Sequence, residues 1–169
     1  MTSLELHTPR LTLYAASTAL LDAELAGREP LAMALHALIP TDWPPGEYDR
    51  DAIEFFRGQV AAGGAAVEPW YSWYAVLNTT SQEPASVVAA GGYFGPPDQS
   101  GGVEIGYSVA TAFRGRGIAS ELVAALVANG FAYLNVTCII AHTSNANPAS
   151  ITVLRTCGFS EGPSLKPEY

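Results

Sequence analysis

The chain has 169 residues, of which 49% are hydrophobic and 14% charged, so it is long enough to bury a core and too apolar to be disordered. Its net charge of −8 argues against nucleic acid or an anionic membrane as a partner, because phosphate binding requires clustered Lys and Arg. Neither a signal peptide nor a membrane span is apparent. We therefore expect a single domain over residues 1–169 in the reducing cytoplasm.

The first half of the chain is predicted to be mainly helical. A strand is expected over residues 10–16, where apolar and polar residues alternate. Two helices follow, over 17–27 and 29–38, the first with Ser17 as its N-cap. Prolines and a glycine indicate a loop at 39–48, and a further helix ends at glycines 63 and 64.

The second half alternates between strands and helices. Residues 70–79 and 86–95 are rich in β-forming residues on either side of a turn, which indicates a hairpin, and 103–110 continues the sheet. A helix should then run to about Gly130, before a short buried strand over 136–143. The last predicted helix lies within 147–159.

This order of elements predicts an α/β (α+β) fold with a single mixed, mostly antiparallel twisted sheet and helices on both faces. The strand at 103–110 and that at 136–143 should be parallel, because a helix connects them. The two cysteines, Cys138 and Cys157, lie in apolar surroundings and are expected to be buried free thiols.

Positive charge and glycine are concentrated in "AFRGRGIASELV" (112–123), although the chain as a whole is acidic. This loop joins a strand to a helix, so its amides lie at a helix N-terminus, where anions bind and glycine permits close approach. A Walker loop is excluded because Lys166 is the only lysine, and the dinucleotide fingerprint lacks its third glycine. A glycine turn at the start of a buried helix remains an alternative.

Two motifs resemble the GNAT superfamily of acyl-CoA-dependent N-acetyltransferases. One is R-x-x-G-x-A (Arg114, Gly117, Ala119) after a strand reading "EIGYSV", and the other is the N-x-x-S helix of "AHTSNANPASITVLRTCGF". In detail, with the opening strand "TPRLTLYAA", the chain resembles the branch that contains the ribosomal-protein N-terminal acetyltransferases. The resemblance covers nearly the whole chain and is strongest over 103–159.

The resemblance implies acetyl-CoA as co-substrate. The amides of 115–120 would hold its pyrophosphate, the backbone of 107–110 would pair with the pantetheine arm where a neighbouring strand splays away, and Asn147 and Ser150 would lie near the thioester. The residues predicted to bind the coenzyme are Tyr107, Ser108, Val109, Arg114, Gly115, Arg116, Gly117, Ile118, Ala119, Ser120, Asn147 and Ser150.

Glu104 and Ser150 are the predicted catalytic residues. In "VEIGYSV", alternation places Glu104, Gly106 and Ser108 on one face, which suits a surface that a ligand crosses but equally suits a solvated face. Glu104 would serve as general base, directly or through water, and a backbone N–H near Val109 would stabilise the oxyanion. Ser150, in the first turn of the helix that Asn147 caps, would assist departure of the thiolate, although it also fits an ordinary first-turn serine.

Aromatic residues in the first half could form the acceptor site. Trp43 and Trp73, with Trp70 and Tyr74 nearby in sequence, would line a cleft for an amine, or they would pack in the core. His142 fits either a proton shuttle or a strand-end residue, and Glu121 is expected to be a hydrogen-bonded structural carboxylate. No metal site is predicted, because the histidines lack Cys, His or Asp neighbours at ligand spacing.

The predicted function is therefore acetyl-CoA-dependent N-acetylation of a primary amine by direct attack. A non-catalytic acyl-CoA sensor or an interaction domain remains the alternative. An N-terminal peptide, a polyamine and an aminoglycoside all remain possible acceptors. After Phe159 only "SEGPSLKPEY" follows, enough for a short strand at most. Either the last strand of the sheet is lost, or a partner chain completes the sheet, or the sequence is truncated; an open sheet edge could support a homodimer.

Overall fold

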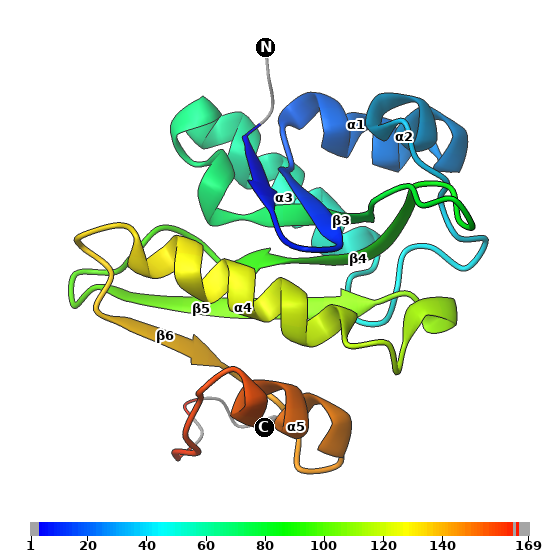
Figure 1. Ribbon diagram of the computed structural model, residues 1–169. Helices are drawn as coiled ribbons and strands as arrows, with labels where there is room; N and C mark the ends of the chain where they lie inside the picture. The colour runs from blue at the N-terminus through cyan, green and yellow to red at the C-terminus, as the bar shows by residue number, and fades with distance from the viewer. Residues whose placement is uncertain (1–3, 164, 166–169) are drawn as a thin grey trace.

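The computed structural model describes residues 4–163 and 165, and these residues contain one six-stranded sheet with the strands in sequence order (Figure 1). Neighbouring strands from β1 to β5 are antiparallel, whereas β6 pairs with β5 in parallel. The strands are β1 (Glu5–His7), β2 (Leu11–Ala15), β3 (Ser72–Leu77), β4 (Ser86–Tyr93), β5 (Gly102–Val109) and β6 (Cys138–Ala141). The predicted mixed, mostly antiparallel sheet is confirmed.

Helices cover both faces of this sheet, as predicted. The first three pack on one face and α4 on the other, with α5 beside α4 and β6 (Figure 1). The helices are α1 (Thr18–Ala26), α2 (Arg28–Leu35), α3 (Arg50–Gly63), α4 (Ile118–Phe131) and α5 (Pro148–Thr156), with short 3₁₀ turns at Gly64–Ala66, Glu68–Trp70 and Thr111–Phe113. Within the described part of the chain, every helix is too short or too polar to cross a membrane.

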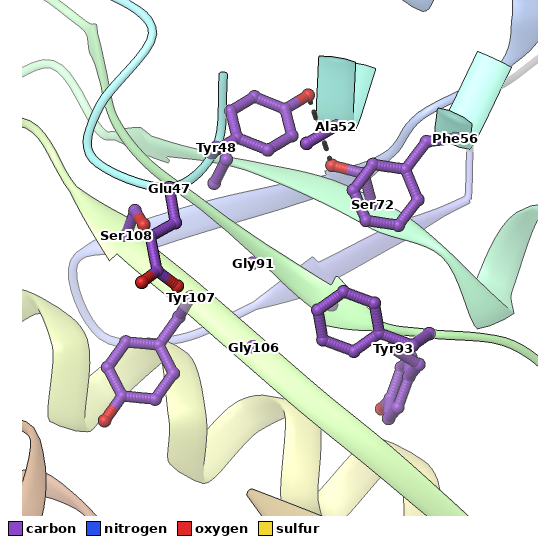
Figure 2. A pocket seen from close by; sticks show the side chains of 13 residues that line it. Glu47, Tyr48, Ala52, Phe56, Ser72, Gly91, Tyr93, Gly106, Tyr107 and Ser108 are labelled. Atoms are coloured by element: carbon purple, nitrogen blue, oxygen red, sulfur yellow. Dashed lines mark hydrogen bonds between the residues drawn. The ribbon is translucent and has the colours of Figure 1, made fainter. Parts of the chain in front are cut away.

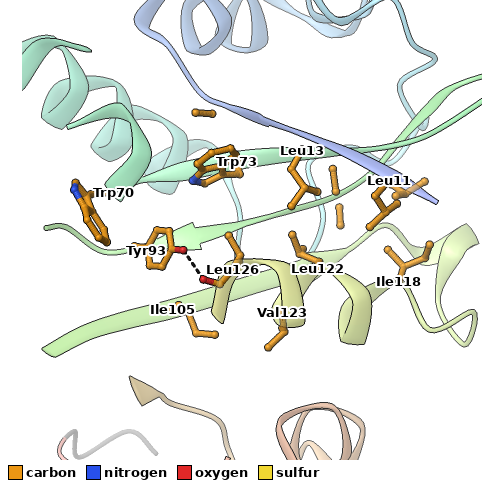
Figure 3. Packing of buried hydrophobic residues seen from close by; sticks show 14 of the residues in the cluster. Leu11, Leu13, Trp70, Trp73, Tyr93, Ile105, Ile118, Leu122, Val123 and Leu126 are labelled. Atoms are coloured by element: carbon orange, nitrogen blue, oxygen red, sulfur yellow. Dashed lines mark hydrogen bonds between the residues drawn. The ribbon is translucent and has the colours of Figure 1, made fainter. Parts of the chain in front are cut away.

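Alternate residues of β3 supply two separate cores. Trp73 contributes to the core under α4, and Tyr74 to the core under α1–α3. On the α4 side, Leu122 and Leu126 are fully buried against the sheet, and each contributes about 1.5–3 kcal/mol through burial (Figure 3). The hydroxyl of Tyr93 donates to the carbonyl of Leu126 at 2.6 Å, which fixes α4 on β4.

The helix ends follow local sequence signals. Ser17 and Asn147 cap α1 and α5, each side chain accepting a hydrogen bond from the amide three residues later. After α5, Gly158 takes a positive φ of 90°, and the Phe159 amide donates to the Leu154 carbonyl at 3.0 Å. The predicted N-cap positions of Ser17 and Asn147 are confirmed.

The strand predicted within 136–143 is present as β6, but the prediction that it is buried is wrong, because β6 lies at the edge of the sheet formed by the described residues. Cys138 is exposed there, so it is not a core thiol, whereas Cys157 is half-buried. The three-residue β1 was not predicted. In the tail, for which at most a short strand was expected, residues 161–163 and 165 adopt no strand, and residues 164 and 166–169 lie outside the described residues.

Candidate active site

The start of α4 has no side-chain cap, in contrast to α1, α3 and α5. Gly115 and Gly117 take positive φ values of 75° and 76°, a conformation that glycine adopts without strain. The first helical hydrogen bond runs from the Glu121 amide to the Gly117 carbonyl at 3.1 Å. The amides of 118–120 therefore have no partner within the helix, and with about half a positive charge they form a site suited to an anion.

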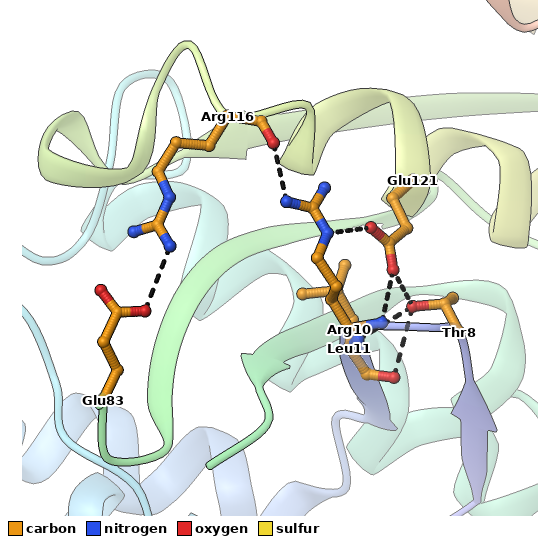
Figure 4. A network of polar contacts seen from close by, with 6 residues as sticks. All are labelled: Thr8, Arg10, Leu11, Glu83, Arg116 and Glu121. Carbon is orange, nitrogen blue, oxygen red and sulfur yellow. Dashed lines mark hydrogen bonds and ion pairs between the residues drawn. The ribbon is translucent and has the colours of Figure 1, made fainter. Parts of the chain in front are cut away.

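Arg10, which directly precedes β2, makes hydrogen bonds that hold the loop before α4 in place (Figure 4). Its guanidinium donates to the Arg116 carbonyl at 2.8 Å and to the Glu121 carboxylate at 2.7 Å. The same carboxylate accepts from the Thr8 hydroxyl at 2.6 Å and from the Arg10 amide at 2.8 Å. Partial burial opposes ionisation of Glu121, but these hydrogen bonds and the Arg10 charge outweigh it and lower the pKa. Glu121 thus has the structural contacts expected for it.

The two predicted coenzyme arginines both make contacts within the protein. Arg114 donates to the Val109 carbonyl at 3.1 Å. Arg116 pairs with Glu83 at 3.1 Å and lies over the Phe113 ring, 5.4 Å from its centroid. Because exposed ion pairs contribute only about 0–1 kcal/mol, a phosphate could replace Glu83 as the partner of Arg116 at little cost.

The backbone of β5 leaves one edge open at the predicted pantetheine segment. Pairing with β6 ends at Ile105 opposite Ala141, so β6 does not accompany residues 106–109. The β5 edge beyond this point borders a gap between the two strands. The predicted splay therefore lies between β5 and β6.

Alternation along β5 determines which backbone groups border the gap. The Ala110 amide donates to the Val88 carbonyl of β4 at 2.8 Å. In an antiparallel ladder these directions alternate, so the backbone of Ser108 also faces β4, whereas Tyr107 and Val109 direct N–H and C=O toward the gap. Three residues of β5 were predicted to contact the coenzyme. The backbone N–H and C=O of one of them, Ser108, point toward β4 and not toward the gap.

Tyr107 and Ser150 come together on the α5 side of β5. Their hydroxyl oxygens are 2.9 Å apart, and the Ser150 amide donates to the Asn147 side chain at 3.1 Å. Burial raises the pKa of Tyr107, against the lowering effect of the Ser150 hydrogen bond, so the phenol stays protonated at neutral pH. Sequence reasoning assigned Tyr107 only a backbone role, because nothing local pairs residues 43 positions apart.

Glu104 lies on the opposite face of β5, next to the point where β6 departs. One carboxylate oxygen is 3.0 Å from Nδ1 of His142, the residue that follows β6. Both side chains are largely buried. Glu104 and Ser150, the two predicted catalytic residues, therefore lie on opposite faces of one strand. No group of three His, Cys, Asp or Glu residues suited to a metal occurs among the described residues.

A cleft of about 480 Å³, partly open to solvent, lies on the same face as Glu104, between α3 and the sheet (Figure 2). Its floor contains Gly91, Gly92 and Gly106, and aromatic rings from three segments form its walls. The lining residues are Glu47, Tyr48, Ala52, Phe56, Ser72, Ala90, Gly91, Gly92, Tyr93, Phe94, Gly106, Tyr107 and Ser108. Sequence reasoning missed Glu47, Phe56 and Phe94, because only tertiary packing brings them to one cavity.

Neither Trp43 nor Trp73, the predicted acceptor contacts, lines this cleft. Trp73 is fully buried in the core under α4, and its indole donates to the Pro69 carbonyl at 3.0 Å. Trp43 is buried beside α1, where its indole donates to Glu24 at 2.8 Å. Both tryptophans therefore pack in the core, which was the alternative to lining the acceptor cleft.

Glu24 in α1 is the acceptor of three side-chain hydrogen bonds beneath the loop that precedes α3. It accepts hydrogen bonds from Trp43 and from the hydroxyls of Tyr48 and Tyr74. Burial raises the pKa of Glu24, although these three hydrogen bonds act in the opposite direction. Since Tyr48 also lines the cleft, this cluster anchors one wall of the cleft to α1 and β3.

Comparison with known proteins places the chain in a family. A family model described as an acetyltransferase (GNAT) domain matches residues 10–160. The chain is also 26% identical over 154 residues to "Uncharacterized N-acetyltransferase YjdG" from Bacillus subtilis (strain 168), a match that covers 91% of this chain and 88% of that protein.

Solved structures share the fold. A ribosomal-protein-S5-alanine acetyltransferase from Vibrio fischeri aligns with a TM-score of 0.63 at 17% identity, covering 93% of this chain and 83% of that one. The microcin C7 self-immunity acetyltransferase MccE, solved with acetyl-CoA and AMP, aligns with a TM-score of 0.60 at 14% identity, covering 90% and 80%. At these identities, the two neighbours support the predicted fold.

Proposed function

This chain belongs to the GNAT acetyltransferase family, and we propose that its single domain transfers the acetyl group of acetyl-CoA to a primary amine. The observation that carries the proposal is the uncapped, glycine-rich start of α4 beside a β5 edge that β6 has left. An anion site meets a segment of β5 that β6 does not pair with, which suits a ligand with a diphosphate and an extended amide-containing arm.

The coenzyme would lie along backbone rather than side chains. The amides of 115–120 would bind the diphosphate, with Arg114 and Arg116 supplying charge, and Tyr107 and Val109 would pair with the pantetheine amides. This orientation is supported by the register of β5, which turns the backbone of both residues toward the gap. Asn147 would orient the first turn of α5 toward the thioester, since it caps that helix.

The acceptor amine would attack the thioester from the face of β5 that carries Glu104. An α-amino group with a pKa near 8 is about one-tenth neutral at pH 7, and an alkylamine near 10.4 is below about a thousandth, so a base is needed. Glu104 would accept the ammonium proton, directly or through a water, and pass it to solvent before attack; it would then accept the second proton that the nitrogen loses as the C–N bond forms. A backbone N–H of β5 near Val109 that the pantetheine arm leaves unpaired would stabilise the oxyanion of the tetrahedral intermediate.

The leaving thiolate would receive its proton on the opposite face. As the C–S bond breaks, the sulfur takes a proton from Ser150, which regains one from the Tyr107 hydroxyl 2.9 Å away, and Tyr107 is reprotonated from solvent. No covalent enzyme intermediate is required. The opposed placement of Glu104 and Ser150 supports this scheme, because proton removal and proton delivery occur on different sides of the scissile bond.

Two measurements on the full chain test the proposal. Calorimetric titration should show binding of acetyl-CoA, and Arg116→Glu should weaken it. Free-thiol release with acetyl-CoA and a panel of amines should be amine-dependent. Absence of coenzyme binding, or thiol release that no amine increases, would contradict the proposal. The cytoplasmic location and the homodimer stay predictions.

A further inference from the structure

The cleft above β5 offers a single charge to a ligand. Of the thirteen residues that line it, Glu47 is the only one with a charged side chain. Figure 2 shows the Glu47 side chain directed toward β5, beside Ser108 and Tyr107. A cleft with one carboxylate and no cation among its described lining residues, in a protein of net charge −8, favours a ligand with one positive charge.

The walls of the cleft are mostly apolar. The Tyr48 and Phe56 rings stack with centroids 6.3 Å apart, and the Phe94 ring lies 6.0 Å from that of Phe56. The floor has no side chains at Gly91 and Gly106, and a Cβ at Gly106 would come within 2.8 Å of the Phe94 ring. This space suits a flat or branched hydrocarbon group and gives few partners to additional polar groups.

The residues on both sides of Glu47, which is itself exposed, are anchored to the rest of the protein. The Tyr48 hydroxyl donates to buried Glu24 at 2.8 Å and accepts from Ser72 at 3.4 Å. On the other side, the backbone of Gly46 packs on β5 so closely that a Cβ there would lie 3.2 Å from the Ser108 hydroxyl. The loop thus presents the Glu47 carboxylate to the strand that would bind the thioester.

We propose that Glu47 is a specificity-determining residue, and that the acceptor is a small primary amine with one positive charge and an uncharged aromatic or branched body. This inference rests on the proposed function. A free amino acid would bring its carboxylate toward Glu47, a polyamine would bury a second ammonium without a second carboxylate in the lining, and a peptide would desolvate its amides against apolar walls.

Recognition by Glu47 is compatible with proton removal by Glu104. An ammonium group has three N–H donors, and the neutral amine keeps two of them. One N–H can therefore remain on Glu47 after another proton has left, which would orient the nitrogen lone pair toward the thioester. Glu47 should thus act on the amine KM, and Glu104 on kcat.

The test compares Glu47→Gln with the wild-type chain under saturating acetyl-CoA. The probes are phenethylamine, phenylalanine, putrescine and a peptide with a free N-terminus. For the wild type, kcat/KM for phenethylamine should exceed the other three by at least about tenfold, as expected for one charge-assisted hydrogen bond. Glu47→Gln should raise the phenethylamine KM by about tenfold and leave the acetyl-CoA KM unchanged.

Glu29→Gln is the matched control, because it removes one exposed carboxylate at the start of α2, outside the cleft. It should leave the phenethylamine KM unchanged. A preference for putrescine or the peptide, or an unchanged KM in Glu47→Gln, would overturn the inference. Calorimetric binding of phenethylamine without acetyl-CoA gives a readout independent of transfer: binding that Glu47→Gln weakens supports the inference even if the proposed catalysis fails, and no binding overturns it.

Discussion

The two faces of β5 differ in the kind of group they present, although they belong to one eight-residue strand. On the α4 and α5 side, Tyr107 reaches Ser150, and the nearby loop before α4 offers backbone amides. On the α3 side, Glu104 and the cleft offer carboxylates and aromatic rings. The difference suggests a division in which one side holds a coenzyme common to the family and the other selects the acceptor.

Replacing the proposed base should produce the largest loss. Glu104→Gln keeps the size of the side chain but cannot accept the proton, so kcat should fall by about 10²-fold or more. Acetyl-CoA affinity, measured by calorimetry, should stay at the wild-type value, because Glu104 lies on the acceptor face. A variant with wild-type kcat would remove Glu104 from the mechanism, and one with weakened coenzyme binding would contradict the division between the faces.

Disturbing the loop should affect the coenzyme alone. Gly117 has a φ of 76°, which a β-branched residue adopts only with strain, so Gly117→Val should weaken acetyl-CoA binding by at least about tenfold. Gly64→Val is the control, since Gly64 has a similar φ of 71° and open space around it. Calorimetry should show wild-type affinity for the control. Equal losses in both variants would point to general destabilisation instead.

The hydroxyl pair should behave as one unit. Tyr107→Phe and Ser150→Ala should each lower kcat by several-fold, up to about tenfold, and the double variant should be little slower than the slower single variant. Tyr133→Phe, a tyrosine packed on Trp70 outside the site, serves as the control in the same assay. Additive losses would show that the two hydroxyls act separately.

The smallest expected effect concerns stability rather than turnover. Burial raises the folded-state pKa of Glu24 above its unfolded value. At pH values between these two pKa values the folded protein binds more protons than the unfolded chain, so its stability falls as the pH rises through this range. Glu24→Gln lacks this ionisation. Urea unfolding at intervals from about pH 4 to about pH 7 should show the free energy of unfolding of the variant improving relative to the wild type. An unchanged difference across the series would contradict the raised pKa.

Local signals made most of the fold predictable. Alternating apolar residues marked the strands from β2 to β5, and Ser17 and Asn147 marked the starts of α1 and α5. The glycines before α4 predicted a backbone anion site, since their positive φ values are a local requirement. β6 was misjudged because its apolar residues resemble those of a central strand, while its edge position depends on what packs beside it.

The acceptor side was much less predictable. Trp43 and Trp73 were chosen for their residue type, but burial beside Glu24 and under α4 depends on how the helices dock. Glu47, Phe56 and Phe94 carry no sequence pattern that links them, and Tyr107 meets Ser150 across 43 residues. Such contacts join residues that are far apart in the sequence, so no short stretch of the chain contains a signal that predicts them.

The order of amino acids alone specified the helices α1–α5, the strands after β1, the family motifs and the glycine loop, because backbone conformation and alternation are encoded over a few neighbouring residues. Only the tertiary structure determined which aromatic rings form the cleft, which carboxylate enters it, and that Glu104 and Ser150 lie on opposite faces of β5 beside a gap. Those properties arise when segments distant in the chain exclude water together, and the free energy of that packing belongs to the whole fold.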